Sequence, residues 1–405
     1  MIPKTQYKIA LDNKSQTNGE KIMRKIFYED INITEFDAKV ISCDFDQDKK
    51  SYKVVLDATA FFPEEGGQSA DVGTLGGQEV KDVQIKEDII YHYVEQAMKV
   101  GSTVSGKVDW KQRFDFMQQH SGEHILSGLI HNRFGYNNVG FHLSTNEVTM
   151  DFNGVLSWEQ VREIELEANR VIYQNIPIEI TYPTKDELVN MTYRSKIEID
   201  GQVRIVTIPG VDVCACCAPH VAYTGQIGMI KVVGLQNYKG GVRLNILCGE
   251  RALRDYSAKF DTVSNIAQDM STKQEQVVEG YQRLKDECQT LKLKVNEIQA
   301  QYLNMTLATL PSPVEAANAI LFTDITDNVA IRNAVNTLME NYSGYSAVFA
   351  GEDGSYRFVA GSKEADCNEL AAKLRTELGA KCGGNKLMIQ GSIEASKEQI
   401  EQIFM

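Results

Sequence analysis

The chain has 405 residues, of which 43% are hydrophobic, and carries 42 Lys and Arg against 55 Asp and Glu, for a formal net charge of -13. This composition excludes a disordered or collagen-like chain and predicts a globular protein of about two to four domains. The negative charge also excludes a protein that binds nucleic acid through a general positive field.

Targeting signals and disulfides are not indicated. No run approaches the ~18 consecutive apolar residues of a membrane-spanning helix, and residues 1–20 lack the apolar segment of a secretory signal. We therefore expect a cytoplasmic protein without a membrane partner. Eight cysteines are too few for a disulfide framework in a chain of this length, and three of them lie within residues 214–217, which points to metal or thiolate chemistry.

The first part of the chain is predicted to be rich in β-structure. Residues 1–22 are polar and without a period, so we expect a tail there. Between residues 23 and 106, β-branched and aromatic residues alternate with turns and predict a small barrel-like subdomain. Its clearest strands are expected at 53–56, 89–93 and 103–105.

Residues 107–250 are predicted to form an α+β domain. A helix is expected over 109–134, where Gly122 and Gly128 allow close packing, and a second over 158–175, with Ser157 as its N-cap. Strands are expected at 178–182, 204–208, 227–233 and 242–247.

Residues 251–309 show a heptad pattern. Apolar residues recur at alternating steps of three and four from Phe260 to Met305, which predicts one long helix, or a hairpin of two helices interrupted near Ser271 and Thr272. Such a helix either lies on a globular domain or acts as a spacer or a coiled coil that forms a homodimer.

A separate C-terminal domain is expected over residues 310–405, after the breaker Leu310-Pro311-Ser312-Pro313. Strands are predicted at 319–323, 345–350, 356–360 and 386–390, and helices at 329–342 and 366–378. This alternation indicates an α/β or α+β domain, and the fold class of the whole chain is α+β.

Two pairs of residues predict a metal site. His120 and His124 are four residues apart on a predicted helix, so both imidazoles project from one face. Cys216 and His220 repeat this spacing on a predicted loop that contains Pro219. Three nitrogens and one sulfur form a favourable tetrahedral set for Zn(II). Cys214 and then Cys217 are the rival sulfur donors.

A competing interpretation rests on the same helix. Residues 120–124 also read H-x-x-E-H, the inverted zinc-peptidase motif, in which Glu123 would be the general base. Glu123 can equally be a solvated residue beside two ligands. A peptidase would need a further carboxylate ligand and would not need Cys216.

Further motifs flank these pairs. Residues 66–73 read GGQxxDxG, and residues 241–252 read GxRxxxxxGERA. In the order GGQxxDxG, HxxxH, CxxxH and GxRxxxxxGERA, the chain resembles the editing domain of alanyl-tRNA synthetase and the freestanding alanyl-tRNA editing proteins. With the heptad segment and the C-terminal domain, it resembles their long form, whose last domain is of the DHHA1 type. The chain departs from the family's usual Cys-Gly-Gly-Thr-His, because it has Cys-Cys-Ala-Pro-His at 216–220.

The resemblance implies an enzyme that acts in trans on tRNA(Ala) carrying a wrong amino acid, chiefly serine and in some members glycine, and not a ligase. Such editing is useful because a pocket built for alanine excludes close analogues only modestly. The resemblance places Thr74 as the reader of the serine hydroxyl, with Gln68 and Asp71 as positioning groups. The zinc would orient the aminoacyl end and a water, unless it is purely structural.

Contacts with tRNA are expected from one basic segment. Between Gln202 and Cys248 the only acidic residue is Asp212, so Arg243, Lys231 and Lys239 can meet tRNA phosphates. A non-enzymatic alternative is a structural-zinc module that binds tRNA or a protein partner.

Overall fold

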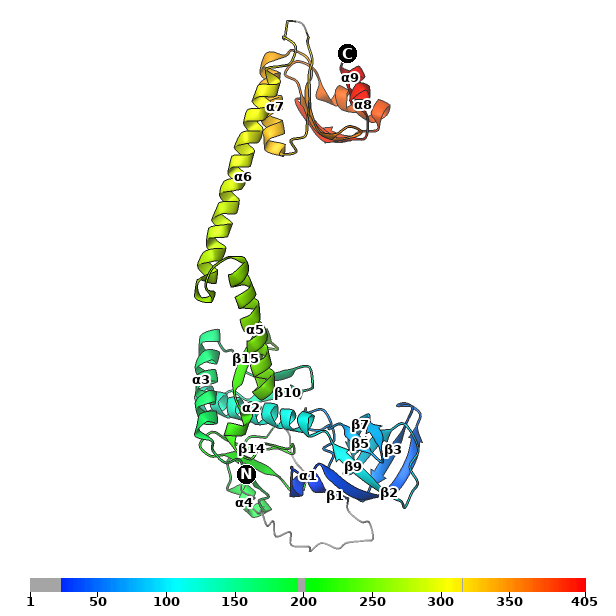
Figure 1. Cartoon of the computed structure of the whole chain (residues 1–405), viewed down its shortest axis with the longest axis vertical. Coiled ribbons are helices and arrows are strands. Elements are labelled where there is room, and N and C mark those ends of the chain that lie inside the picture. The colour runs from blue at the N-terminus through cyan, green and yellow to red at the C-terminus, as the bar shows by residue number, and fades with distance from the viewer. Residues whose placement is uncertain (1–22, 196–200, 315) are drawn as a thin grey trace. The chain divides into compact units, whose positions relative to one another are not determined.

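The computed structural model describes residues 23–195, 201–314 and 316–405. The predicted tail at residues 1–22 lies outside the described residues. The chain divides into two compact units, Met1–Thr262 and Val263–Met405 (Figure 1). None of the described helices has both the length and the apolar content that crossing a membrane requires.

The N-terminal part of the first unit is a seven-stranded antiparallel sheet with the strand order β6-β5-β9-β2-β3-β8-β7. Because β6 also lies against β8, the sheet is nearly closed, which confirms the barrel-like prediction. Its interior is filled by apolar side chains such as Phe61 and Phe62. The strands are β2 Glu35–Asp46, β3 Ser51–Leu56, β5 Gly73–Leu75, β6 Gln78–Val80, β7 Asp82–Lys86, β8 Ile89–Val94 and β9 Thr103–Val108; a short parallel pair, β1 Arg24–Lys25 and β4 Ala58–Thr59, and the helix α1 Ile26–Glu29 complete this part.

Helix α2, Trp110–Phe134, is the central element of the first unit and confirms the predicted helix. It begins where the Asp109 side chain accepts hydrogen bonds from two backbone N–H groups, and it ends at Gly135 with a left-handed φ of 71°. Gly122 and Gly128 let the helix approach its neighbours, since an added Cβ would lie 2.4 Å from Cys248 Sγ and from the Val211 carbonyl oxygen, respectively.

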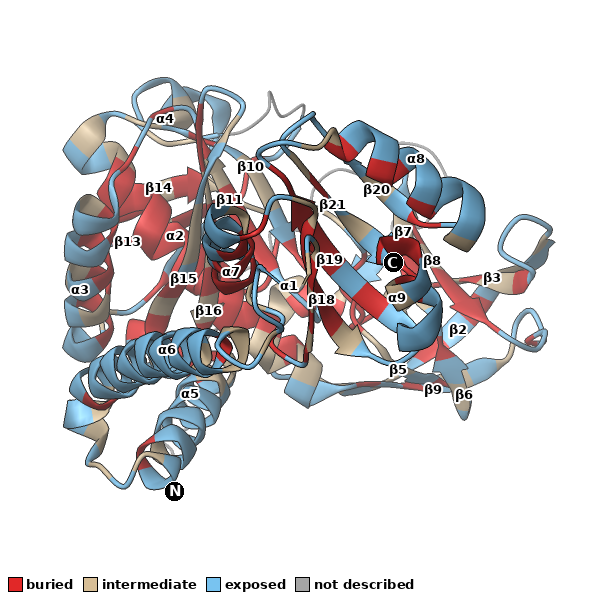
Figure 2. Ribbon diagram, turned by 90° about the horizontal axis from the view of Figure 1, so that it is seen from above, coloured by how far each residue is buried: buried red, intermediate tan, exposed pale blue. Residues whose placement is uncertain are grey.

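A second core surrounds α2. Helix α3, Trp158–Gln174, begins with the predicted Ser157 cap, and it packs with α2 against a four-stranded sheet of order β10-β11-β16-β15 and a three-stranded sheet of order β12-β13-β14. Figure 2 shows that α2 and the strands beside it are mostly buried. The remaining bounds are β10 Asn138–Leu143, β11 Val148–Phe152, β12 Glu179–Thr181, α4 Lys185–Val189, β13 Ile205–Ile208, β14 Asp212–Ala215, η1 Thr224–Ile227, β15 Ile230–Tyr238 and β16 Gly241–Cys248.

The heptad segment forms two helices and not one continuous helix, and they are separated near Ser271 and Thr272, where the sequence predicted an interruption. Helix α5 spans Gly249–Asp269, and after the short turn η2 (Gln274–Gln276) helix α6 spans Val277–Leu307. The break contains Ser271 with a φ of 50°, and a hydrogen bond from Gln274 Nε2 to Ser264 Oγ of 2.6 Å closes the turn.

The C-terminal domain is a five-stranded sheet with apolar side chains on both faces, which agrees with the predicted α+β character. Strand order is β17-β18-β19-β21-β20, and only β17 and β18 are parallel. Helices α8 and α9 cover one face, whereas α7 and the end of α6 cover the other. The bounds are β17 Ala319–Thr323, α7 Asn328–Asn341, β18 Ser346–Glu352, β19 Ser355–Gly361, α8 Cys367–Leu378, β20 Lys381–Gly384, β21 Met388–Ile393 and α9 Lys397–Phe404.

Candidate metal centre

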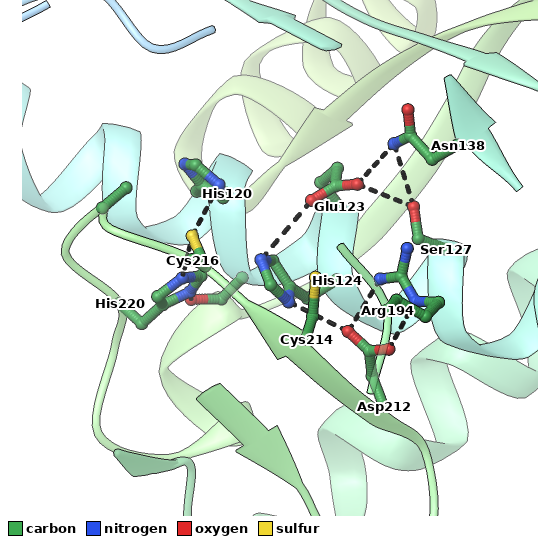
Figure 3. A network of polar contacts seen from close by, with 12 residues as sticks. His120, Glu123, His124, Ser127, Asn138, Arg194, Asp212, Cys214, Cys216 and His220 are labelled. Carbon is green, nitrogen blue, oxygen red and sulfur yellow. Dashed lines mark hydrogen bonds and ion pairs between the residues drawn. The ribbon is translucent and has the colours of Figure 1, made fainter. Parts of the chain in front are cut away.

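The two predicted ligand pairs meet in the interior of the first unit (Figure 3). One donor atom from each of His120, His124, Cys216 and His220 lies within 4.8 Å of the others. The Cys216 sulfur is 3.5 Å from His120 Nε2 and 3.4 Å from His220 Nε2. The three histidines are at most 2% exposed. The group therefore has the donor chemistry and the compactness of a metal site.

Each imidazole is oriented by a hydrogen bond at its Nδ1 atom. The partners are Gln68 Oε1 for His120 at 2.8 Å, Asp212 Oδ2 for His124 at 2.9 Å and Ser121 Oγ for His220 at 3.0 Å. A ring that donates from Nδ1 leaves its Nε2 lone pair for a cation, and metal-bound histidines are usually held in this way. All three rings thus turn the correct nitrogen inward.

The loop that carries Cys216 is fixed by a buried arginine. Arg204, which precedes β13, donates from Nη1 to the carbonyl oxygens of Cys216 at 2.7 Å and Ala218 at 2.9 Å. Strand β14 ends at Ala215 and leads directly into this loop. These contacts set where the sulfur points, which a sequence motif cannot specify.

The three neighbouring thiols differ in acidity. Burial alone would raise the pKa of Cys216, but His120 and His220 together with hydrogen bonds from the histidines hold it well below its usual value. Burial raises the pKa of Cys214 to about 11 and also raises that of Cys217. A metal binds the thiolate, so Cys216 is the best donor of the three.

Asp212 supports the cluster from outside. Its carboxylate accepts from His124 and also from Arg194, whose Nε and Nη2 donate at 2.7 and 2.8 Å. Burial works to raise the pKa of Asp212, yet these two cationic partners hold it below its usual value. Burial likewise works against a charged His124, but Asp212 above all raises the His124 pKa well above its usual value. Asp212 is therefore a charged group that orients His124.

We expect Asp212→Asn to weaken metal binding by about 10- to 100-fold, the usual cost of losing such an orienting partner. The asparagine keeps an acceptor for His124 but loses the charge that raises the basicity of the ring. Titration of the protein with Zn(II) against a chromophoric chelator measures this change. Asp109→Asn is the matched control, because it alters the cap of the same helix and should leave the affinity unchanged; equal affinity in both variants would contradict the assigned role.

Glu123 is buried, so the structure overturns its interpretation as a solvated residue. It is 1% exposed, and its Oε1 accepts from Ser127 Oγ at 2.7 Å and from Asn138 Nδ2 at 2.5 Å. Its Oε2 lies 3.7 Å from His124 Nε2. The sequence of the helix did not indicate that Glu123 is buried, because one of its partners, Asn138, comes from another element, β10.

The three predicted site residues in and directly after the GGQxxDxG segment, Gln68, Asp71 and Thr74, lie in different surroundings. Gln68 contacts His120 because the loop before it turns against β10. Gly66 and Gly67 form this turn with φ of 63° and 84°. The Leu143 N–H donates to the Gly67 carbonyl oxygen at 2.7 Å. Asp71 forms a buried ion pair with Arg113. Thr74 lies exposed on β5, opposite Lys107 of β9. Gln68 alone among them contacts the described metal-site histidines.

The three predicted phosphate contacts also differ. Arg243 forms a bidentate ion pair with Asp151 at 2.6 and 2.7 Å, and its guanidinium lies 3.9 Å from the Tyr238 ring centre. Lys231 Nζ lies 2.5 Å from Glu165. Lys239 is exposed at the turn between β15 and β16, with its ammonium over the Tyr238 ring.

A cavity of about 640 Å³ opens on the outer side of this network. Its walls come from the end of α2, the start of β10 and the turn before β14, and they include Asn138, Arg194 and Asp212. These residues contact Glu123 and His124 on their other sides, so the cavity lies next to the groups that orient the cluster.

Three protein families match parts of the chain. The family of class II (A) tRNA synthetases matches residues 3–112, the second additional domain of threonyl and alanyl tRNA synthetases matches residues 203–245, and the DHHA1 domain matches residues 315–404. The second match contains Cys216 and His220, and the third covers the C-terminal sheet domain.

Longer similarities join these segments. The chain is 28% identical to the alanyl-tRNA editing protein AlaX-L of Pyrococcus horikoshii, over 94% of this chain and 96% of that protein. It is 31% identical to the alanine–tRNA ligase of Pyrococcus furiosus over 94% of this chain but only 43% of the ligase, so it spans less than half of that relative. The solved C-Ala domain of the Aquifex aeolicus alanyl-tRNA synthetase aligns with 22% of the chain at 18% identity and a TM-score of 0.19, which supports no conclusion.

Proposed function

We propose that the chain hydrolyses the ester bond of mischarged tRNA(Ala), because it matches the second additional domain and the DHHA1 domain and is similar over 94% of its length to an alanyl-tRNA editing protein. The observation that carries this proposal is the buried cluster of His120, His124, Cys216 and His220, with Gln68 against it. Ser-tRNA(Ala) is the proposed main substrate and Gly-tRNA(Ala) a second one.

We propose Zn(II) as the metal held by this cluster. With zinc–sulfur and zinc–nitrogen bonds of about 2.3 and 2.0–2.1 Å, the sulfur and a nitrogen of a tetrahedral site lie about 3.5 Å apart. The observed separations of 3.5 and 3.4 Å from the Cys216 sulfur to His120 Nε2 and His220 Nε2 fit this geometry. When bound, zinc supplies Lewis-acid polarisation of an oxygen atom.

The protein groups around the cluster have two proposed tasks. The first is to exclude bulk water, a task that the burial of the histidines supports. Exclusion of water strengthens every polar contact with the ester. The second is to stabilise negative charge on the ester carbonyl oxygen. Gln68 suits this task because its side chain is fully buried and its Nε2 has no hydrogen-bond partner among the described residues.

Gln68→Glu tests this role with little change in shape. The glutamate keeps an oxygen that accepts from His120 Nδ1 but removes the amide donor, so we expect kcat to fall about 100- to 1,000-fold, as for the loss of one oxyanion-stabilising donor. Single-turnover deacylation measures the change, and the metal content should stay at the wild-type level. A variant that retains full kcat would show that the amide does not contact the reacting ester.

Thr74 remains the proposed reader of the serine hydroxyl, a role that rests on the family resemblance. We expect Thr74→Val to lower the preference for Ser-tRNA(Ala) over Gly-tRNA(Ala) by up to about tenfold, the value of one hydrogen bond. The ratio of the two kcat/KM values measures this preference. Because Thr74 lies on β5 without a described contact to the cluster, an unchanged ratio would assign the serine contact to another residue.

The positive groups of the β15–β16 hairpin are proposed contacts for tRNA phosphates. Lys239 is the strongest of the three, because it is exposed at the turn, whereas Arg243 and Lys231 already face Asp151 and Glu165. A side-chain cation that is already paired with a carboxylate binds phosphate weakly. Arg243 and Lys231 would therefore contribute to tRNA binding chiefly by fixing the hairpin.

Deacylation of Ser-, Gly- and Ala-tRNA(Ala) by the full-length, zinc-loaded protein tests the proposed function. We expect rapid loss of serine and sparing of alanine, since a site that hydrogen-bonds the hydroxyl leaves polar groups unpaired with alanine. Absence of hydrolysis of every mischarged tRNA(Ala), combined with stoichiometric tRNA binding, would instead support the non-enzymatic zinc module.

The inverted zinc-peptidase is the second candidate, and the position of Glu123 beside His124 favours it. Against it, the cluster includes Cys216, which that motif does not need, and the nearby carboxylate of Asp212 is already engaged by Arg194. Cleavage of unstructured peptides by a Cys216→Ala variant that still binds metal would support the peptidase.

A further inference from the structure

The ring of Phe141 lies against the metal cluster. Phe141 comes from β10, and its ring centre is 4.8 Å from that of His120, with 56° between the two ring planes. The other ring contacts of the three metal-site histidines are with one another. Phe141 is therefore the one aromatic side chain outside the cluster, among the described residues, whose ring packs on a metal-site imidazole.

Phe141 and Gln68 are held next to the same imidazole by backbone contacts. The loop around Gln68 runs along the end of β10, where the Ser69 N–H donates to the Leu143 carbonyl oxygen at 2.9 Å and the Leu143 N–H donates to that of Gly67 at 2.7 Å. Gly67 leaves no room for a side chain, because an added Cβ would lie 2.3 Å from the Phe141 carbonyl oxygen. The loop therefore lies in close contact with Phe141.

This corner of the site combines a buried polar donor with an apolar wall. Gln68 is fully buried, and its Nε2 has no hydrogen-bond partner among the described residues. Phe141 is half-buried and Gly67 beside it is exposed, so Phe141 lies between the buried cluster and the surface. Sites for small ligands have this composition, in which apolar side chains form the walls and a few polar groups fix the orientation of the ligand.

We propose that the side chain of the aminoacyl group packs against Phe141, and that this ring sets the largest amino acid that the site accepts. The inference rests on the proposed deacylase function, in which Gln68 Nε2 donates to the ester carbonyl oxygen. The Cβ atom of an amino acid is two bonds from the carbonyl carbon. Its side chain must therefore fit among the groups that surround Gln68, and the Phe141 ring is one of them. Glycine and serine fit, whereas threonine and valine do not.

The wall is part of a closely packed sheet. Phe141 pairs with Met150 of β11, and β11 pairs in turn with β16. On the neighbouring residue Gly140, an added Cβ would lie 2.8 Å from Asp151 Oδ2. Phe141 also packs against the core that surrounds α2. In a pocket that cannot widen, one extra carbon atom lowers acceptance by about 10- to 200-fold, and threonine is serine with one more methyl group.

Phe141→Ala tests the wall with serine and threonine, because these amino acids share the hydroxyl and differ only in size. We expect the full-length, zinc-loaded wild type to prefer Ser-tRNA(Ala) to Thr-tRNA(Ala) by about 10- to 200-fold in kcat/KM. In Phe141→Ala this preference should fall by about tenfold or more, because one extra carbon is no longer excluded. The value of kcat/KM for Gly-tRNA(Ala) should stay near that of the wild type. Single-turnover deacylation measures all three substrates.

Two further variants control for effects on the fold. His142→Ala should keep the wild-type preference, because this exposed residue is next to Phe141 but on the opposite face of β10. Phe141→Leu keeps an apolar side chain and should change the preference in the same direction as Phe141→Ala, so it gives the same comparison if the alanine variant loses its metal. An unchanged preference in a Phe141 variant with full metal content would overturn the inference, even where Ser-tRNA(Ala) is hydrolysed rapidly.

Binding of stable analogues separates this inference from the proposed function. In seryl- and threonyl-3′-amino-3′-deoxyadenosine an amide replaces the ester, so calorimetry measures recognition without hydrolysis. We expect the threonyl analogue to bind the wild type about tenfold more weakly than the seryl analogue, or more weakly still, and to regain affinity in Phe141→Ala. This binding pattern without hydrolysis of any ester would contradict the proposed function and support the wall. Equal binding of the two analogues by the wild type, or binding of neither, would overturn the inference.

Discussion

Cys216→Ala should lose both the metal and the deacylase activity, whereas Cys217→Ala and Cys214→Ala should keep both. The expected loss in kcat/KM exceeds about 100-fold, since removing a partner that only orients a ligand already costs 10- to 100-fold. Metal analysis of the purified proteins and single-turnover deacylation of Ser-tRNA(Ala) measure the two properties on the same samples.

The reason lies in the different positions of the three sulfurs. The Cys216 sulfur touches two inward-facing Nε2 atoms, and its pKa is held well below the usual value. Cys214 keeps its proton, with a pKa raised to about 11 by burial. Cys217 faces the barrel side, where its sulfur lies 3.2 Å from the place that a Cβ on Gly66 would take. The neighbouring thiols are therefore controls of the same residue type whose sulfurs do not touch the two Nε2 atoms.

The same set of variants distinguishes a metal that takes part in hydrolysis from a metal that only stabilises the fold. A Cys216→Ala protein that is folded, metal-free and inactive would support a metal with a part in hydrolysis. A metal-free protein that unfolds at room temperature would support a structural zinc. A Cys216→Ala protein that retains its metal would support the H-x-x-E-H alternative, in which Cys216 is not a ligand.

The sequence predicted the parts of the site that depend on local spacing. His120 and His124 share a face because helix geometry places residues four apart together, and Cys216 and His220 repeat the interval. The predicted cap at Ser157 and the break near Ser271 were also correct, because caps and breaks are decided by a few adjacent residues.

The groups that orient the cluster were not predictable in this way. His124 and Asp212 are 88 residues apart, and Gln68 and His120 are 52 apart. The residue types alone do not indicate which carboxylate will face which imidazole ring. The acids that face Arg243 and Lys231 were not predictable for the same reason, because they come from β11 and α3 and lie outside the basic segment.

Asp71 was predicted as a positioning residue of the site, and the structure gives it a second task. It is 1% exposed and forms a buried ion pair with Arg113 of α2, with Arg113 Nε at 2.9 and 3.0 Å from its two oxygens. Its Oδ2 also accepts from the Phe62 N–H at 2.6 Å. Arg113 donates further to the Ala60 carbonyl oxygen at 2.6 Å, so the pair joins the barrel to α2.

We expect Asp71→Ala to lower the free energy of unfolding of the first unit by about 3–5 kcal/mol, because it leaves the buried Arg113 charge without its partner. Denaturant unfolding followed by tryptophan fluorescence reports on this unit alone, since Trp110 and Trp158 are the only tryptophans of the chain. Glu29→Ala, which removes the exposed ion pair with Arg24, is the control and should cost no more than about 1 kcal/mol.

A double variant distinguishes the ion pair from a role of Asp71 in the reaction. Asp71→Ala with Arg113→Met removes both charges, and an apolar pair of this kind recovers much of the lost stability. If Asp71 acts only through the fold, deacylation by the double variant should recover together with its stability. Recovery of stability without recovery of kcat would show that the carboxylate is needed at the site, and an Asp71→Ala protein as stable as the wild type would show that the buried pair does not hold the barrel on α2.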